Sequence, residues 1–95
     1  MNEHNEYGLK PGTWRHYKTG IYVVFTLVTH MDNPATGKME LLADPLVVYR
    51  DLAPVMRHVD GKHTYVIQHY ARPLSEFTGK VKKEDGTEVK RFEKI

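Results

Sequence analysis

The chain has 95 residues, of which 40% are hydrophobic and 27% are charged. This is the composition of one globular domain, and it excludes a fibrous or disordered chain. With 14 Lys and Arg against 12 Asp and Glu, the net charge is +2. That balance excludes a strongly charge-driven polyanion binder, but it leaves room for a local basic site.

Several absences narrow the class of protein further. The chain has no cysteine, which excludes disulfides, thiolate catalysis and cysteine-ligated metals. Its longest apolar run, Ile21–Val28, is far shorter than the about 18 residues of a membrane helix. Residues Met1–Glu6 are polar and acidic, unlike a signal peptide. We therefore expect a cytoplasmic protein that contacts no membrane, with a flexible tail over residues 1–10 and one domain over residues 11–95.

The first elements in chain order form a predicted hairpin. Lys10–Gly12 is a turn signal that opens a strand over Thr13–Lys18. Thr19–Gly20 is a turn, and it leads into Ile21–Thr29. Because that segment is rich in β-branched and aromatic residues, it predicts a central strand that is apolar on both faces.

The middle of the chain is dense in turn formers. Asp32–Gly37 predicts a loop, and Lys38–Ala43 predicts a weak edge strand that ends at Asp44–Pro45. Leu46–Arg50 predicts a short strand. Asp51–Arg57 stays open between a loop and a single helical turn.

The last third predicts one strand, one helical turn and one hairpin. Val59–Lys62 contains an Asp-Gly turn, and His63–Tyr70 alternates as a strand. Arg72–Phe77 predicts a short helical turn with a proline in its first turn. Lys80–Lys83 and Glu88–Phe92 predict a final hairpin. Together these elements predict a mainly β fold, a small barrel or roll of about five to seven short antiparallel strands with one short helical turn.

Four groups of residues resemble one known family. They are Pro11–Lys18 with Gly20 and Tyr22, Val47–Arg50, Arg72–Leu74 with Phe77, and Gly86 with Arg91 and Phe92. In this order and over residues 11–92 they resemble domain of unknown function 1653, a family of short, mostly bacterial proteins. The resemblance implies a small β-rich barrel similar to SH3-like barrels, and it implies no activity.

The chain also departs from the family's pattern. The link from His30 to Pro45 is longer than in relatives, and Asp51–Lys62 is longer as well. Tyr70 stands where relatives usually have a tryptophan, two positions before the Arg-Pro pair. The resemblance therefore implies nothing about sites in those loops.

The first candidate site is an aromatic and basic strip that begins at Trp14. Trp14, Arg15, His16, Tyr17 and Lys18 could hold a base, a nucleotide or an anionic peptide by stacking and charge. The alternative is that the two aromatic residues pack on opposite faces of a thin barrel, because strand alternation separates them.

The second candidate site is a set of arginines. Two or three guanidinium groups that converge would bind a carboxylate or a phosphate. The alternative is that each arginine pairs with a nearby acid, as Arg72 would with Glu76. Arg72 is the strongest candidate, because it precedes a proline and lies near aromatic residues. The candidate ligand-binding residues are Trp14, Arg15, His16, Tyr17, Tyr49, Arg50, Tyr70, Arg72, Phe77 and Arg91.

The six histidines show no metal-ligand spacing, so we expect no metal and no cofactor. Strand alternation could bring His16 and His69 together, which would permit acid–base catalysis.

Three functions remain open. The leading hypothesis is a non-enzymatic binding module with an aromatic and arginine-lined face, for which nucleic acid or nucleotide is favoured slightly over peptide or a protein partner. One alternative is a small enzyme that acts on an anionic metabolite, with His16 or His69 as the acid–base group. Another is assembly, including homodimerisation through an edge strand at Lys38–Ala43.

Overall fold

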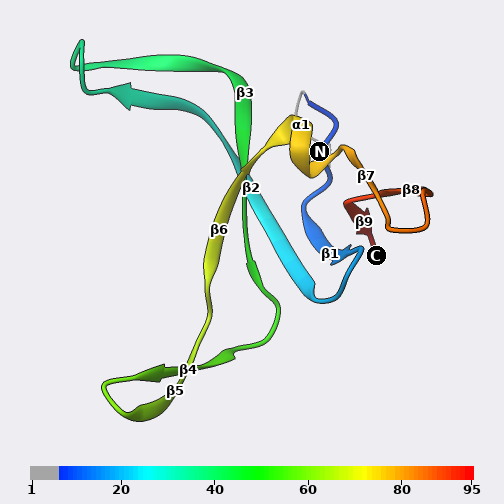
Figure 1. Cartoon of the computed structure of the whole chain (residues 1–95). Coiled ribbons are helices and arrows are strands. Elements are labelled where there is room, and N and C mark those ends of the chain that lie inside the picture. The colour runs from blue at the N-terminus through cyan, green and yellow to red at the C-terminus, as the bar shows by residue number, and fades with distance from the viewer. Residues whose placement is uncertain (1–6) are drawn as a thin grey trace.

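The computed structural model describes residues 7–95, so residues 1–6 of the predicted flexible tail lie outside it. The described chain is mainly β, with one short helix (Figure 1). The elements are β1 (Gly12–His16), β2 (Ile21–Asn33), β3 (Lys38–Asp51), β4 (Val55–Val59), β5 (Lys62–Val66), β6 (His69–Pro73), α1 (Leu74–Phe77), β7 (Lys80–Lys82), β8 (Glu88–Lys90) and β9 (Phe92–Lys94).

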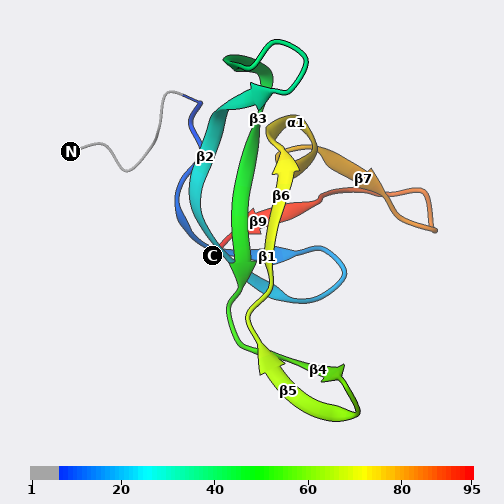
Figure 2. The same cartoon turned by 90° about the vertical axis from the view of Figure 1, so that its left-hand side faces the viewer.

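Five strands form one antiparallel sheet in the order β6-β3-β2-β1-β9. Two small hairpins, β4–β5 and β7–β8, form separate sheets. In Figure 1, β1, β9, the β7–β8 hairpin and α1 all lie to one side of the long strands. Figure 2, turned by 90°, shows β9 crossing behind β3 and β6. The sheet is therefore curled, and its inner face is covered.

The core lies inside this curl. Its buried residues are Leu9, Val24, Val47, Tyr49, Phe77 and Phe92. Helix α1 supplies Phe77, which has no exposed surface and stacks on Phe92 at 4.1 Å between ring centres. The Asp44 carboxylate fixes the start of the helix, because it accepts hydrogen bonds from the backbone N–H and the hydroxyl of Ser75.

The distal parts of β2 and β3 extend beyond the neighbouring strands β1 and β6 and pair only with each other. The predicted break at Asp44–Pro45 is wrong, because β3 runs without interruption from Lys38 to Asp51. The pairing resumes after an irregularity, with Val28 opposite Leu46 and His30 opposite Leu41. This bulge accommodates a proline that has no N–H to donate.

The segment from Asp51 to Tyr70 also differs from expectation. Asp51–Arg57, left open between a loop and a helical turn, is a short loop that leads into β4 at Val55, and His63–Tyr70 contains parts of two strands rather than one. The cause is Gln68, whose backbone pairs with Asp51: the Asp51 N–H donates to the Gln68 carbonyl at 3.1 Å. The β4–β5 hairpin is thereby separated from β6.

Two hairpins project from the curled sheet. They are the distal part of β2–β3 and the β4–β5 hairpin, and in Figure 1 they point away from the helix side. The radius of gyration is 16.0 Å, against about 13 Å for a compact domain of about 100 residues. The projecting hairpins account for this excess.

The predicted fold class, a mainly β antiparallel roll with one short helical turn, is confirmed. The described residues form nine strands, more than predicted. One reason is the division of His63–Tyr70, and another is β9, which begins at Phe92 and pairs with β1. No helix within residues 7–95 is long and apolar enough to cross a membrane.

Candidate functional site

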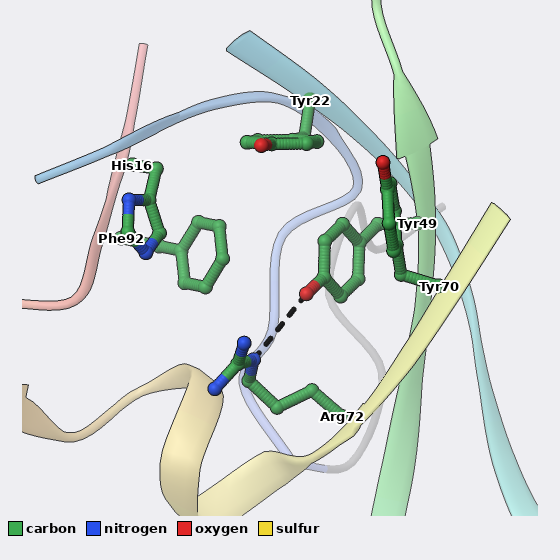
Figure 3. A pocket seen from close by; sticks show the side chains of 6 residues that line it. All are labelled: His16, Tyr22, Tyr49, Tyr70, Arg72 and Phe92. Atoms are coloured by element: carbon green, nitrogen blue, oxygen red, sulfur yellow. Dashed lines mark hydrogen bonds between the residues drawn. The ribbon is translucent and has the colours of Figure 1, made fainter. Parts of the chain in front are cut away.

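A cavity of about 130 Å³ opens on the inner side of the curled sheet. Figure 3 shows its side chains around one space, with His16 and Phe92 opposite Tyr49 and Tyr70. The lining residues are His16, Tyr22, Tyr49, Tyr70, Arg72 and Phe92.

Strand register brings these residues together from distant parts of the chain. Tyr49 and Tyr70 are direct cross-strand partners, and so are His16 and Phe92. Side chains of paired residues lie on the same face of a sheet. The rings of Tyr49 and Tyr70 accordingly stack with 5.3 Å between their centres, and Tyr22 meets Tyr49 edge-on at 5.5 Å.

The turn before β2 lets Tyr22 take its place. Gly20 has φ +94°, and a Cβ atom there would lie 3.0 Å from the Tyr22 hydroxyl. Glycine suits this position for two reasons: its φ is positive, and the Tyr22 hydroxyl lies close to the place where a side chain would begin.

Arg72 brings a guanidinium group to the cavity. Its Nε donates to the Tyr49 hydroxyl at 3.3 Å, and its Cζ lies 6.0 Å from the centre of the Phe92 ring. The predicted pair with Glu76 is present, with 3.7 Å between Nη1 and the carboxylate. Because Glu76 is exposed, this contact restrains the arginine only weakly.

His16 brings an imidazole whose tautomer is fixed. The backbone N–H of Lys18 donates to its Nδ1 at 3.2 Å, so the ring proton resides on Nε2. Burial lowers the pKa of His16 below its ordinary value, and the positive charges of Arg72, Arg91 and Lys18 lower it further. At neutral pH this imidazole is therefore uncharged and donates through Nε2.

Asp51 is a buried acidic residue that positions Tyr70 by a hydrogen bond. Only 7% of its surface is exposed, and it accepts hydrogen bonds from the Tyr70 hydroxyl at 3.1 Å and the Gln68 N–H at 3.0 Å. Burial and this hydrogen bond raise the pKa of Tyr70 to about 12.

The electrostatic sign of the cavity is positive. Of the residues that the structure describes, no aspartate or glutamate lines it. Both carboxylate oxygens of Asp51 are engaged by Tyr70 and Gln68. An aromatic cage for an ammonium group would lack a counter-charge and would face Arg72, so the arrangement suits an anion.

The other predicted aromatic and basic residues lie outside this cavity. Trp14 packs edge-on against Phe77 at 5.2 Å, and its Nε1 donates to the Lys10 carbonyl. Phe77 itself belongs to the core. Arg15 and Tyr17 line a second hollow of about 160 Å³, which they share with His16.

The remaining predicted site residues also lie outside the residues that line this cavity. Arg50 donates to the Asp51 carbonyl, and Arg91 is half-buried with an Nε that has no partner among residues 7–95. His69 is exposed and contacts Phe25. The idea that alternation brings His69 to His16 is wrong, because the cavity side of β6 belongs to its neighbour Tyr70.

Two lining residues, Tyr22 and Phe92, were not among the predicted site residues. Both do belong to the segments that carry the family resemblance. Within residues 7–95, no cluster of three or more metal-ligating side chains exists.

The chain belongs to the family described as protein of unknown function DUF1653, whose model matches residues 12–94. No curated protein and no solved structure matches the chain. Of the lining residues, His16, Tyr22, Tyr49, Arg72 and Phe92 lie in the segments that carry the resemblance to this family. Segments spread along the whole chain thus meet at one cavity.

Proposed function

We propose that this protein is a small binding module that holds a nucleotide, or one nucleotide unit of a nucleic acid, at the cavity of His16 and Arg72. The observation that carries the proposal is the position of the Arg72 guanidinium beside the stacked Tyr49 and Tyr70 rings. A guanidinium binds phosphate oxygens, and a base can stack on the half-buried Tyr22 or Tyr70 ring at the edge of the cavity, whereas Tyr49 is buried.

The size and charge of the site limit what it binds. A cavity of about 130 Å³ accepts part of one nucleotide, not a stretch of strand. The net charge of +2 supplies little attraction for a long polyanion. These features favour a single nucleotide unit over an extended nucleic acid.

The direct test is a thermal-shift screen at low salt with nucleotides and short single-stranded oligonucleotides. A ligand that binds only the folded state raises Tm by mass action. We expect a rise for the wild type and for Arg57→Ala, whose exposed guanidinium contacts Gln68, and no rise for Arg72→Ala. A flat screen of the wild type would contradict the proposal.

The enzymatic alternative draws less support. A general base needs an unprotonated nitrogen that faces the substrate. In His16 the Nδ1 atom is occupied by the Lys18 N–H, which leaves Nε2 as a donor.

A second candidate, self-association, is favoured by one observation. The Lys38–Ala43 part of β3 pairs with β2 but not with β6, which begins opposite Arg50 and ends opposite Leu46. It therefore presents a strand edge with exposed Met39 and Leu41. Sedimentation at high concentration tests this role: a dimer lost in Leu41→Lys would support it, and a monomer would exclude it.

Two finer inferences rest on the sequence. We infer a cytoplasmic location from the absence of cysteine. The family resemblance supports a bacterial source and a likeness of the curled sheet to SH3-like barrels. Fractionation of cells that express the full-length protein would test the location.

A further inference from the structure

The volume of the cavity determines which part of a ligand it can hold. An apolar cavity of about 150 Å³ holds one benzene molecule, so a cavity of about 130 Å³ has room for one compact group. One compact group, such as a phosphate, fills that space. The rest of the ligand must then lie outside, against the rim.

The polar atoms at the cavity are hydrogen-bond donors with spare capacity. Arg72 uses its Nε for Tyr49 and its Nη1 for Glu76, and its Nη2 has no partner within residues 7–95. His16 presents Nε2–H, because Lys18 occupies Nδ1. A group with several anionic oxygens satisfies both residues at once.

The charges around His16 are mostly positive. On the cavity side and beside it are Arg72 from β6, Arg91 before β9, and Lys18 from the turn after β1. On the other side, the second hollow adds Arg15, Lys83 and Glu93. The phenols nearest to it are Tyr17 and Tyr22. These cations attract an anion that enters the cavity, where the uncharged His16 donates through Nε2.

We propose that the cavity binds a terminal phosphate, a monoester dianion held by Arg72 and by the Nε2–H group of His16. This inference rests on the proposed function and specifies which group of the nucleotide enters. An internal phosphodiester is disfavoured, because two flanking sugars would have to pass through a space that holds one phosphate.

The first experiment compares adenosine with adenosine monophosphate by calorimetry at low salt. Hydrogen bonds to a charged group contribute about 1.5–3 kcal/mol, so we expect the monophosphate to bind roughly 10–100-fold more tightly. Arg72→Gln should abolish this difference, and Arg57→Gln, outside the cavity, should preserve it.

The outcomes separate the two proposals. Equal affinity for nucleoside and nucleotide would overturn the terminal-phosphate site and leave the binding module standing. No binding of either would overturn both. These outcomes do not depend on whether a variant folds, because they are measured on the wild type.

The source of the phosphate is tested with oligonucleotides. If a strand with a terminal phosphate binds as tightly as the mononucleotide, the ligand is a strand end; if only the mononucleotide binds, it is a free nucleotide. Either result supports the proposal. Equal binding of strands with and without the terminal phosphate would overturn it.

The role of His16 is tested with inorganic sulfate, a dianion that carries no base or sugar. We expect His16→Phe, which lacks the Nε2–H donor, to bind sulfate severalfold more weakly than the wild type. His16→Asn, which keeps a donor, should bind it more tightly than His16→Phe. Equal sulfate affinity of His16→Phe and the wild type would contradict a contact between His16 and the phosphate.

Discussion

The hydrogen bond between Tyr70 and Asp51 anchors one wall of the cavity. Removal of the hydroxyl in Tyr70→Phe leaves the Oδ1 of a buried carboxylate without its donor. We expect a loss of about 1–3 kcal/mol in the free energy of unfolding, measured by urea denaturation. Tyr65→Phe is the matched control, because Tyr65 is 71% exposed, and it should change little. Equal stability of the two variants would contradict the role of Asp51.

The same tyrosine predicts a response to alkaline pH. Its pKa is raised from 10.0 to about 12 in the folded state, so the folded protein favours the neutral phenol. The stabilisation is therefore complete below about pH 10 and is lost as the pH rises towards about 12. Urea midpoints across this range should fall in the wild type and fall less in Tyr70→Phe. Part of the fall should remain, because the pKa of Tyr22 is raised as well.

Among the elements, helix α1 depends most on a single distant side chain. It has four residues, too few to be stable alone, and Asp44 binds its first turn through Ser75. We expect Asp44→Ala to cost about 1 kcal/mol in unfolding free energy, as loss of a helix cap does. Asp32→Ala is the control, because Asp32 is exposed in the distal part of the β2–β3 hairpin. A change of similar size in both variants would show that Asp44 has no special role.

The sequence predicted elements well where local pattern decides them. The Asp60–Gly61 turn was predicted from residue types that tolerate positive φ, and both residues adopt it. The division between β5 and β6 could not be predicted. It depends on the pairing of Gln68 with Asp51, a contact between residues far apart in the chain. The continuity of β3 through Pro45 depends in the same way on a bulge opposite β2.

At the scale of the whole molecule, the last strand, β9, completes the curled sheet by pairing with β1. Phe92 is 3% exposed, stacks on Phe77 and lines the cavity, and β9 pairs with β1. Loss of a buried phenylalanine alone costs about 3–5 kcal/mol, out of roughly 5–14 kcal/mol for a chain of this length. We therefore expect a chain that ends at Arg91 to be unfolded by circular dichroism. A cooperative thermal transition in that chain would contradict this view of the closure.

The site was partly visible in the sequence. Aromatic and basic residue types indicated His16, Tyr49, Tyr70 and Arg72 as candidates, and these four line the cavity. Which residues converge depends on register between strands, which a single sequence does not encode locally. Phe77 has the same residue type as Phe92, yet it lies wholly in the core. Tyr22 and Phe92 could have been found only from their place in the family's motif segments.

The measurement that tests the central claim most directly is a heteronuclear NMR titration of the full chain with adenosine monophosphate at low salt. We expect the largest shifts at the side chains of Arg72 and His16 and at the backbone around Tyr22, Tyr49 and Tyr70. The chemical shifts of the β4–β5 hairpin and of the distal part of the β2–β3 hairpin should remain unchanged. Shifts centred on either projecting hairpin, or none at saturating ligand, would contradict the assignment of binding to this cavity.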